Sequence, residues 1–188
     1  MMFAGIRHRF RLNAKATSEL GNLGPTGRAK VVGKAAPGKQ LLVAPITGRS
    51  CVFYSVEIGE WFNGTKTPLL DETSTEVFRI DDATGYALVD PSLVQSILKT
   101  RRARGHSSEA LGEHRILLKR NGFTMLDEYG ELRSLAYSET IIAPDDTICV
   151  LGAVSQRSDP NGAASYREQP RQTVLGADGD TPLLLCEA

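Results

Sequence analysis

The sequence predicts a mainly β (α+β) fold: a small OB-like β-barrel of about six or seven strands with a helical insertion. Two observations predict the strands, namely short segments in which apolar and polar residues alternate, and Gly-, Pro- or Asp-containing turns between them. A third observation predicts the insertion, because apolar residues recur at helical spacing after Asp90.

The clearest strand begins at Cys51. Val52, Tyr54, Val56 and Ile58 fall on one side of a segment with period 2, and the residues between them fall on the other side. This pattern predicts a strand with one face in the core.

A β-hairpin is predicted farther along the chain. The segments 77–80 and 86–89 alternate, and their predicted core positions are Phe78, Ile80, Ala87 and Val89. Between them lies Asp82-Ala83-Thr84-Gly85. Asp at the first position and Gly at the fourth fit a type I turn closed by a glycine bulge, which predicts a positive φ at Gly85 and local hydrogen bonds for the aspartate.

Two helices are predicted within the insertion, residues 91–122. Asp90 can cap a first helix beginning at Pro91, and basic residues up to Arg104 suit its C-terminal end. The apolar stripe of this helix would be Leu93, Val94, Ile97 and Leu98. A second helix, from Ser107 or Ser108 to Leu118, would end at Asn121-Gly122.

Further strands are predicted at residues 28–35, 132–142, 148–154, 174–175 and 183–185. The polar segment 155–172 contains the turn Asp159-Pro160-Asn161-Gly162 and predicts a mobile loop. The sequence therefore predicts one domain at 28–188, preceded by a basic arm and linker at 1–27.

The positive charge of the basic arm is balanced by negative charge elsewhere in the chain. The formal net charge is zero, but cations gather in residues 1–40 and carboxylates in residues 51–90. The arm combines Phe3, Ile6 and Phe10 with Arg7, Arg9 and Arg11. One interpretation is an interfacial segment on an anionic membrane surface. The other is an arm that packs on the acidic face of its own domain, residues 57–90, or on a protein partner.

A second basic run contains Arg101, Arg102 and Arg104, which we interpret as a solvated helix end that is also a candidate partner contact. Nucleic-acid binding would require aromatic residues among the basic ones, and residues 91–120 contain none. Nucleic acid is therefore not an expected partner.

Catalytic, cofactor-binding and metal-binding residues are not predicted. Three cysteines and three histidines lack the paired spacing of a zinc site, and the odd cysteine count argues against a disulfide framework. The pair Asp81-Asp82 belongs to the predicted turn. No Walker loop, G-x-G-x-x-G or G-x-S-x-G occurs. An enzyme is therefore not the favoured interpretation, and no cofactor is expected.

Several motifs resemble those of one known family. They are Gly33, Ala44-Pro45-Ile46-Thr47-Gly48, Cys51-Val52, Tyr54, Trp61, and the segment 78–85 followed by Val89 and Pro91. Their order and spacing are similar to those of the GIDE domain, also called the Beside-A-Membrane (BAM) domain, known from bacterial membrane proteins and from ubiquitin ligases of the MULAN type. The RING that transfers ubiquitin in those ligases needs eight Cys and His ligands and is absent here, and no apolar run approaches the length of a membrane helix.

The resemblance implies a non-catalytic interaction module that acts near a membrane or on a membrane-associated complex, including one of a ubiquitin-like pathway. Trp61, within the motif, is a candidate partner contact. The alternative is an OB-like domain that binds a small molecule or an oligonucleotide, or a hydrolase or transferase that uses the barrel mouth. The expected location is the cytoplasm, peripheral to a membrane in the first interpretation.

Overall fold

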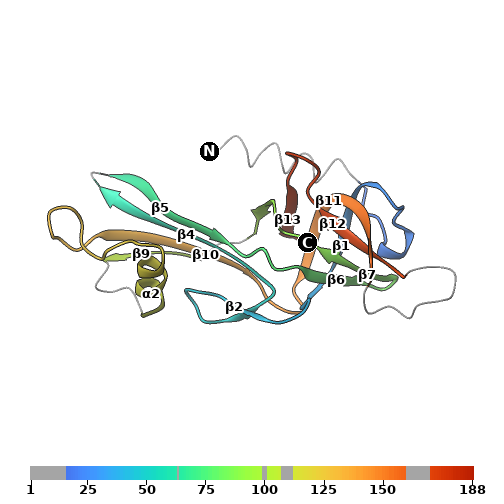
Figure 1. Ribbon diagram of the computed structural model, residues 1–188, viewed down its shortest axis with the longest axis horizontal. Coiled ribbons are helices and arrows are strands. Elements are labelled where there is room, and N and C mark those ends of the chain that lie inside the picture. Colours follow the sequence, from blue (N-terminus) through green and yellow to red (C-terminus); the bar gives the residue numbers. More distant parts are fainter. Residues whose placement is uncertain (1–15, 63, 99–100, 107–111, 160–169) are drawn as a thin grey trace. The chain divides into compact units, whose positions relative to one another are not determined.

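The computed structural model describes residues 16–62, 64–98, 101–106, 112–159 and 170–188. The chain forms two compact units, each assembled from separate segments of the sequence (Figure 1). The barrel unit comes from the ranges 1–40, 75–98 and 143–188, and the insert unit from 41–74 and 99–142. The sequence predicts one domain over residues 28–188, and the structure divides this range between the two units.

Five strands close the barrel. They are β1 (Gly27–Ala36), β6 (Phe78–Asp82), β7 (Gly85–Val89), β11 (Thr147–Ser158) and β12 (Arg171–Gly176). Their order is β1-β6-β7-β12-β11, and pairing of β1 with β11 closes the ring. All neighbours are antiparallel except β7 and β12, which are parallel. The third barrel strand thus lies beside the fifth, the Greek-key arrangement of an OB-like barrel. The predicted fold class is confirmed, but five strands close the barrel instead of the predicted six or seven.

Residues that alternate along the strands fill the barrel. On β1 the alternation buries Ala29, Val31 and Ala35. On the hairpin of β6 and β7 it buries Phe78, Ile80, Ala87 and Val89, as predicted. The position of the insert unit in the chain follows from this topology: residues 41–74 separate the first and second barrel strands, and residues 99–142 separate the third and fourth.

Two shorter strands extend the barrel sheet. Strand β13 (Leu183–Glu187) pairs with residues 148–151 of β11, whereas β12 pairs with residues 153–158 of the same strand. Strand β8 (Val94–Ile97) lies parallel to β13.

The described part of the predicted N-terminal linker is docked on the barrel. Thr17 forms a β-bridge with Lys30, and the 3₁₀ helix η1 (Leu20–Asn22) follows. Leu20 is buried. The backbone N–H of Leu20 donates to Asp82 Oδ2, and that of Gly21 donates to Thr84 Oγ1, both at 2.8 Å. The prediction of a linker is therefore wrong from residue 16 onward, because this segment contacts the barrel.

The insert unit contains a four-stranded antiparallel sheet of order β5-β4-β10-β9 and one α-helix. Its elements are β2 (Leu42–Val43), β3 (Ser50–Cys51), β4 (Phe53–Phe62), β5 (Thr65–Thr73), β9 (Arg101–His106), α2 (Gly112–Arg120) and β10 (Ser134–Ile142). Val56 and Ile58 of β4 and Leu135 of β10 pack with Leu117 and Leu118 of α2. The predicted strand after Cys51 is thus confirmed, as is the second predicted helix over Gly112–Arg120; its predicted start at Ser107 or Ser108 lies outside the described residues.

The first predicted helix of the insertion is wrong. Its sequence forms β8 and then β9 instead of a helix with a basic C-terminal turn. Strand β8 pairs with β13, and β9 pairs with β10, which lies more than thirty residues later. Local periodicity cannot show that distant strands offer free edges, and β-branched Val94 and Ile97 suit a strand.

Two smaller expectations are also corrected. The φ of Gly85 is not positive, because Gly85 pairs with Asp82 as the first residue of β7. The predicted loop 155–172 is shorter at both ends, since β11 continues to Ser158 and β12 begins at Arg171. Within the described ranges, the helices are too short and too polar to cross a lipid bilayer.

Candidate functional site

A groove of about 590 Å³ lies on the barrel unit, on the outer face of the hairpin of β6 and β7. Its walls come from the chain after β1, the chain before β6, and the ends of β11 and β12. The lining residues are Pro37, Gly38, Lys39, Thr75, Glu76, Val77, Arg79, Tyr86, Leu88, Arg157, Asp159 and Gln172. The groove therefore covers the second and third barrel strands and is flanked by residues 37–39 and 75–77, which adjoin the first and second strands, and by Asp159, which follows the fourth.

The floor of the groove follows from strand alternation. Phe78 and Ile80 point into the barrel, so Arg79 between them points outward. The same alternation on β7 turns Tyr86 and Leu88 outward. Arg79 pairs with Leu88 across the hairpin. Core packing of the hairpin therefore fixes which side chains form the groove floor.

Arg79 is held over the ring of Tyr86. The guanidinium carbon lies 5.5 Å from the ring centroid, a cation–π distance. Asp81, on the same face of β6, accepts a hydrogen bond from Arg79 Nη2 at 3.0 Å and lies 2.8 Å from Nε. Tyr86 is 47% exposed, so its ring is available to a ligand.

Arg157 is fixed at the rim of the groove by Asp90. Arg157 Nη2 donates to Asp90 Oδ2 at 2.7 Å, and the backbone N–H of Ser92 donates to Asp90 Oδ1 at 3.2 Å. Burial raises the pKa of Asp90, but the hydrogen bonds from Arg157 and Ser92 outweigh it and hold the pKa below its usual value. Asp90 therefore remains a carboxylate and orients Arg157.

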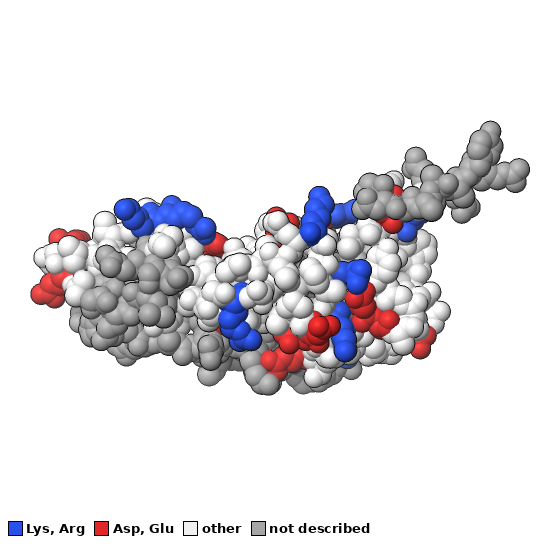
Figure 2. Space-filling view, turned by 90° about the horizontal axis from the view of Figure 1, so that it is seen from below, with Lys and Arg blue, Asp and Glu red and all other residues white. Residues whose placement is uncertain are grey.

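The groove carries both signs of charge. Lys39, Arg79 and Arg157 line it together with Glu76 and Asp159. In Figure 2, blue and red side chains lie side by side over the part of the molecule that contains the barrel. Such a surface suits a ligand that carries cations and anions at different points.

The described part of the groove lining supplies hydrogen-bonding and charged groups. It includes hydroxyls from Thr75 and Tyr86 but, among the described residues, no histidine, cysteine or serine that could form a nucleophile and base pair. Across the described ranges, no three His, Cys, Asp or Glu side chains come together as a metal site.

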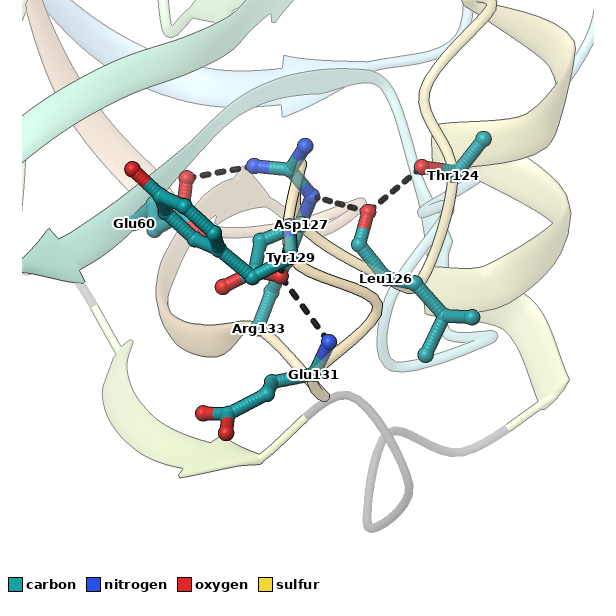
Figure 3. A network of polar contacts seen from close by, with 7 residues as sticks. All are labelled: Glu60, Thr124, Leu126, Asp127, Tyr129, Glu131 and Arg133. Carbon is teal, nitrogen blue, oxygen red and sulfur yellow. Dashed lines mark hydrogen bonds and ion pairs between the residues drawn. The ribbon is translucent and has the colours of Figure 1, made fainter.

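A second exposed surface lies on the insert unit, in the loop between α2 and β10 (Figure 3). Asp127 Oδ1 accepts hydrogen bonds from the backbone N–H groups of Tyr129 and Glu131, both at 2.9 Å. Arg133 Nε donates to the carbonyl of Leu126 at 3.1 Å, and Arg133 Nη1 pairs with Glu60 of β4. These contacts fix the loop to the sheet.

The fixed loop presents large apolar side chains to solvent. Tyr129 is 76% exposed, Leu132 is 48% exposed and Leu126 is 45% exposed. Leu126 and Leu132 form a β-bridge, so their side chains lie near each other at the base of the loop. Exposed tyrosine on a rigid backbone is typical of protein-binding surfaces, because little side-chain entropy is lost on binding.

The structure describes only some of the predicted contact residues. Phe3, Ile6, Arg7, Arg9, Phe10 and Arg11 lie outside the described residues. Trp61 is half-buried on β4, opposite Lys66 of β5. Arg101, Arg102 and Arg104 lie on β9, opposite residues of β10. Among the described side chains that line the groove, Trp61 does not occur.

Sequence reasoning missed the groove, although part of its signal was present. The predicted hairpin already placed Arg79 and Tyr86 on the face opposite the core. Arg157 and Gln172 could not be added, because only the pairing of β11 with β12, and of β12 with β7, brings the ends of these strands beside the hairpin.

Asp82, in contrast, performs the predicted turn chemistry. Its Oδ1 accepts hydrogen bonds from the backbone N–H groups of Thr84 at 2.7 Å and Gly85 at 3.0 Å.

Comparisons with models of known protein families, with curated proteins and with solved structures find no match to this chain.

Proposed function

We propose that this chain is a non-catalytic interaction module whose barrel groove binds an extended, mixed-charge segment of a protein partner. One observation carries the proposal. The groove lies over the second and third barrel strands, the face on which OB-like barrels bind their ligands.

The charges of the groove favour a polypeptide over a polyphosphate chain. Nucleic-acid affinity depends on cations that are free to replace counterions along the phosphates. Arg79 and Arg157 are already paired with Asp81 and Asp90, and Glu76 and Asp159 would face the phosphates. A peptide can instead place an acidic residue at Lys39 and a basic residue at Glu76.

Tyr86 and Leu88 supply the apolar part of the recognition. They lie next to each other on the groove side of β7, with the guanidinium of Arg79 over the tyrosine ring. We therefore expect the bound segment to carry an aromatic or long aliphatic side chain between its charged residues.

Selection from a random peptide display library on the immobilised full chain tests this function. Affinities of the selected peptides are then measured by fluorescence anisotropy. Tyr86→Ala should weaken binding by roughly tenfold or more, because it removes an exposed aromatic contact. Tyr129→Ala, at the exposed loop of the insert unit, distinguishes the two surfaces: peptides that bind in the groove should keep their affinity for this variant, and a loss would place them on that loop.

The alternative function is an oligonucleotide-binding barrel, which the Arg79–Tyr86 pair favours. The same assay distinguishes the two functions. Fluorescent oligothymidylate and oligouridylate are titrated with the same variants. If they bind at physiological salt and lose affinity in Tyr86→Ala, the peptide proposal is wrong. If selected peptides bind both tyrosine variants as well as the original chain, the groove is not their site.

The membrane setting is the part of the proposal that rests on the resemblance to GIDE domains and on the basic arm. Each basic residue near an anionic surface contributes about 1 kcal/mol, so Arg7, Arg9 and Arg11 support only weak, salt-sensitive attachment. Sedimentation with anionic vesicles, at low and high salt, compares the full chain with one that lacks residues 1–12. A difference at low salt that disappears at high salt supports attachment through the arm; equal sedimentation assigns the arm to protein contacts.

A further inference from the structure

Two of the three cysteines lie directly opposite each other in the barrel sheet. Cys149 of β11 pairs with Cys186 of β13 in an antiparallel register, although 37 residues separate them in the sequence. Directly opposite residues of an antiparallel pair present their side chains on the same face of the sheet, with Cβ atoms about 4.5–5.5 Å apart, so the two thiols lie within reach of each other. The spacing of the cysteines in the sequence does not indicate this pair, because only the pairing of β11 with β13 brings the two together.

The surroundings of the pair leave one sulfur protected and the other accessible. Cys149 is 3% exposed and packs with Leu151 and Leu184, whereas Cys186 is partly exposed. An incoming small molecule therefore reaches the pair through Cys186.

The pair also ionises more easily than an ordinary thiol. A hydrogen bond from the Cys186 thiol and, to a smaller extent, the ammonium of Lys30 lower the pKa of Cys149 to about 7 against the effect of burial. The pKa of Cys186 is raised, since it supplies the proton of this bond. The two thiols thus share one proton after the first ionisation, so a thiolate is present at neutral pH.

We propose that Cys149 and Cys186 are a reversible thiol–disulfide site, oxidised by low-molecular-weight disulfides of the glutathione type. When the shared proton resides on Cys149, the Cys186 thiolate attacks one sulfur of the small disulfide. That S–S bond breaks, and the first small thiol leaves with a proton from solvent.

Cys149 then loses its proton and attacks the Cys186 sulfur of the mixed disulfide. The second small thiol leaves, and the Cys149–Cys186 bond forms. Two protein thiols have lost two electrons and two protons, and one small disulfide has been reduced to two thiols.

The product crosslinks β13 to the strand that closes the barrel. Strand β11 pairs with β1, β12 and β13, so the bond fixes the C-terminal strand to the centre of the sheet. Strand β8 pairs with β13, so the same bond also holds β8 to the barrel sheet. Oxidation should therefore slow exchange of the β13 amides and raise the melting temperature.

Cys51 provides an internal control. It lies in the insert unit, is fully buried, and burial together with the charge of Glu139 raises its pKa to about 11. It should remain a thiol while the other two react.

To test this proposal, the full chain is equilibrated with defined ratios of reduced and oxidised glutathione, and the reaction is quenched with acid. The free thiols of the protein are then counted after unfolding. The count should fall from three to one, the intact mass should fall by two hydrogens, and proteolytic mapping should join Cys149 to Cys186. Cys51→Ser should form the same bond and end with no thiol. Cys149→Ser should accumulate a glutathione adduct on Cys186 instead.

Three results would overturn the proposal: three thiols that persist at every glutathione ratio, a stable glutathione adduct on Cys186 of the unmodified chain, or a bond that includes Cys51. Circular dichroism of each variant confirms folding. If a single serine variant is unfolded, the thiol count and peptide map of the unmodified chain still decide the matter.

Discussion

Leu20 and Asp82 are joined by a hydrogen bond of 2.8 Å from the backbone N–H of Leu20 to Asp82 Oδ2, across 62 positions of the sequence. The other carboxylate oxygen of Asp82 closes the turn between β6 and β7 through Thr84 and Gly85. One side chain thus organises the hairpin and anchors the N-terminal segment on it.

Asp82→Ala should lower the free energy of unfolding by about 1–2 kcal/mol, because charge-assisted hydrogen bonds to three backbone N–H groups are lost. Residues 16–24 should also become more sensitive to protease. Thermal denaturation and limited proteolysis measure the two effects. Asp180→Ala, at an exposed turn, serves as the control and should match the original chain in both assays.

Acid should remove the contribution of Asp90. Its pKa in the folded chain lies below the usual value of 3.8, so its interaction with Arg157 stabilises the fold above that value and is lost as the pH falls through the folded pKa. Asp90→Asn should therefore be less stable than the original chain at neutral pH, and the difference should shrink below about pH 4. Denaturation midpoints between about pH 7 and about pH 3 measure this, and a constant difference would contradict it.

Gly33 should tolerate substitution less than Gly85. A Cβ on Gly33 would lie 2.4 Å from the carbonyl oxygen of Asp81, where β1 changes its partner from β11 to β6. A Cβ on Gly85 meets nothing closer than 3.9 Å. Gly33→Ala should cost about 1–3 kcal/mol through overpacking, and Gly85→Ala should cost less than about 1 kcal/mol. Urea denaturation of both variants tests the ranking, and the reverse order would show that the turn at Gly85 needs a glycine after all.

Arg133 should contribute more to the stability of the insert unit than Arg120 does. The side chain of Arg133 is 19% exposed and contacts both Glu60 and the carbonyl of Leu126, whereas that of Arg120 is 61% exposed in its pair with Glu72. Arg133→Ala should cost about 1–3 kcal/mol by leaving Glu60 without its cation, and Arg120→Ala less than about 1 kcal/mol.

The fluorescence of Trp61 measures this difference, because Trp61 is the one tryptophan of the chain and lies on β4 of the insert unit. Equal urea midpoints for Arg133→Ala and Arg120→Ala would mean that the loop is not fixed to the sheet through Arg133.

The sequence by itself determined the features that depend on neighbours along the chain. Alternation predicted the core faces of the β6–β7 hairpin and of β4, and turn chemistry predicted the local hydrogen bonds of Asp82. Helical spacing together with Asn121-Gly122 predicted α2, which ends there with a φ of 82° at Gly122. These signals suffice because the contacts involved lie within a few residues.

The tertiary structure decided everything that depends on which strand lies beside which. Residues 91–104 look helical by spacing, yet residues 94–97 pair with β13 and residues 101–106 pair with β10 as two separate strands. The groove needs the ends of β11 and β12 beside the hairpin, and the thiol pair needs β13 beside β11. A sequence pattern shows which face of a strand is apolar but not which distant strand will satisfy its backbone hydrogen bonds, so these sites appear only when the barrel closes.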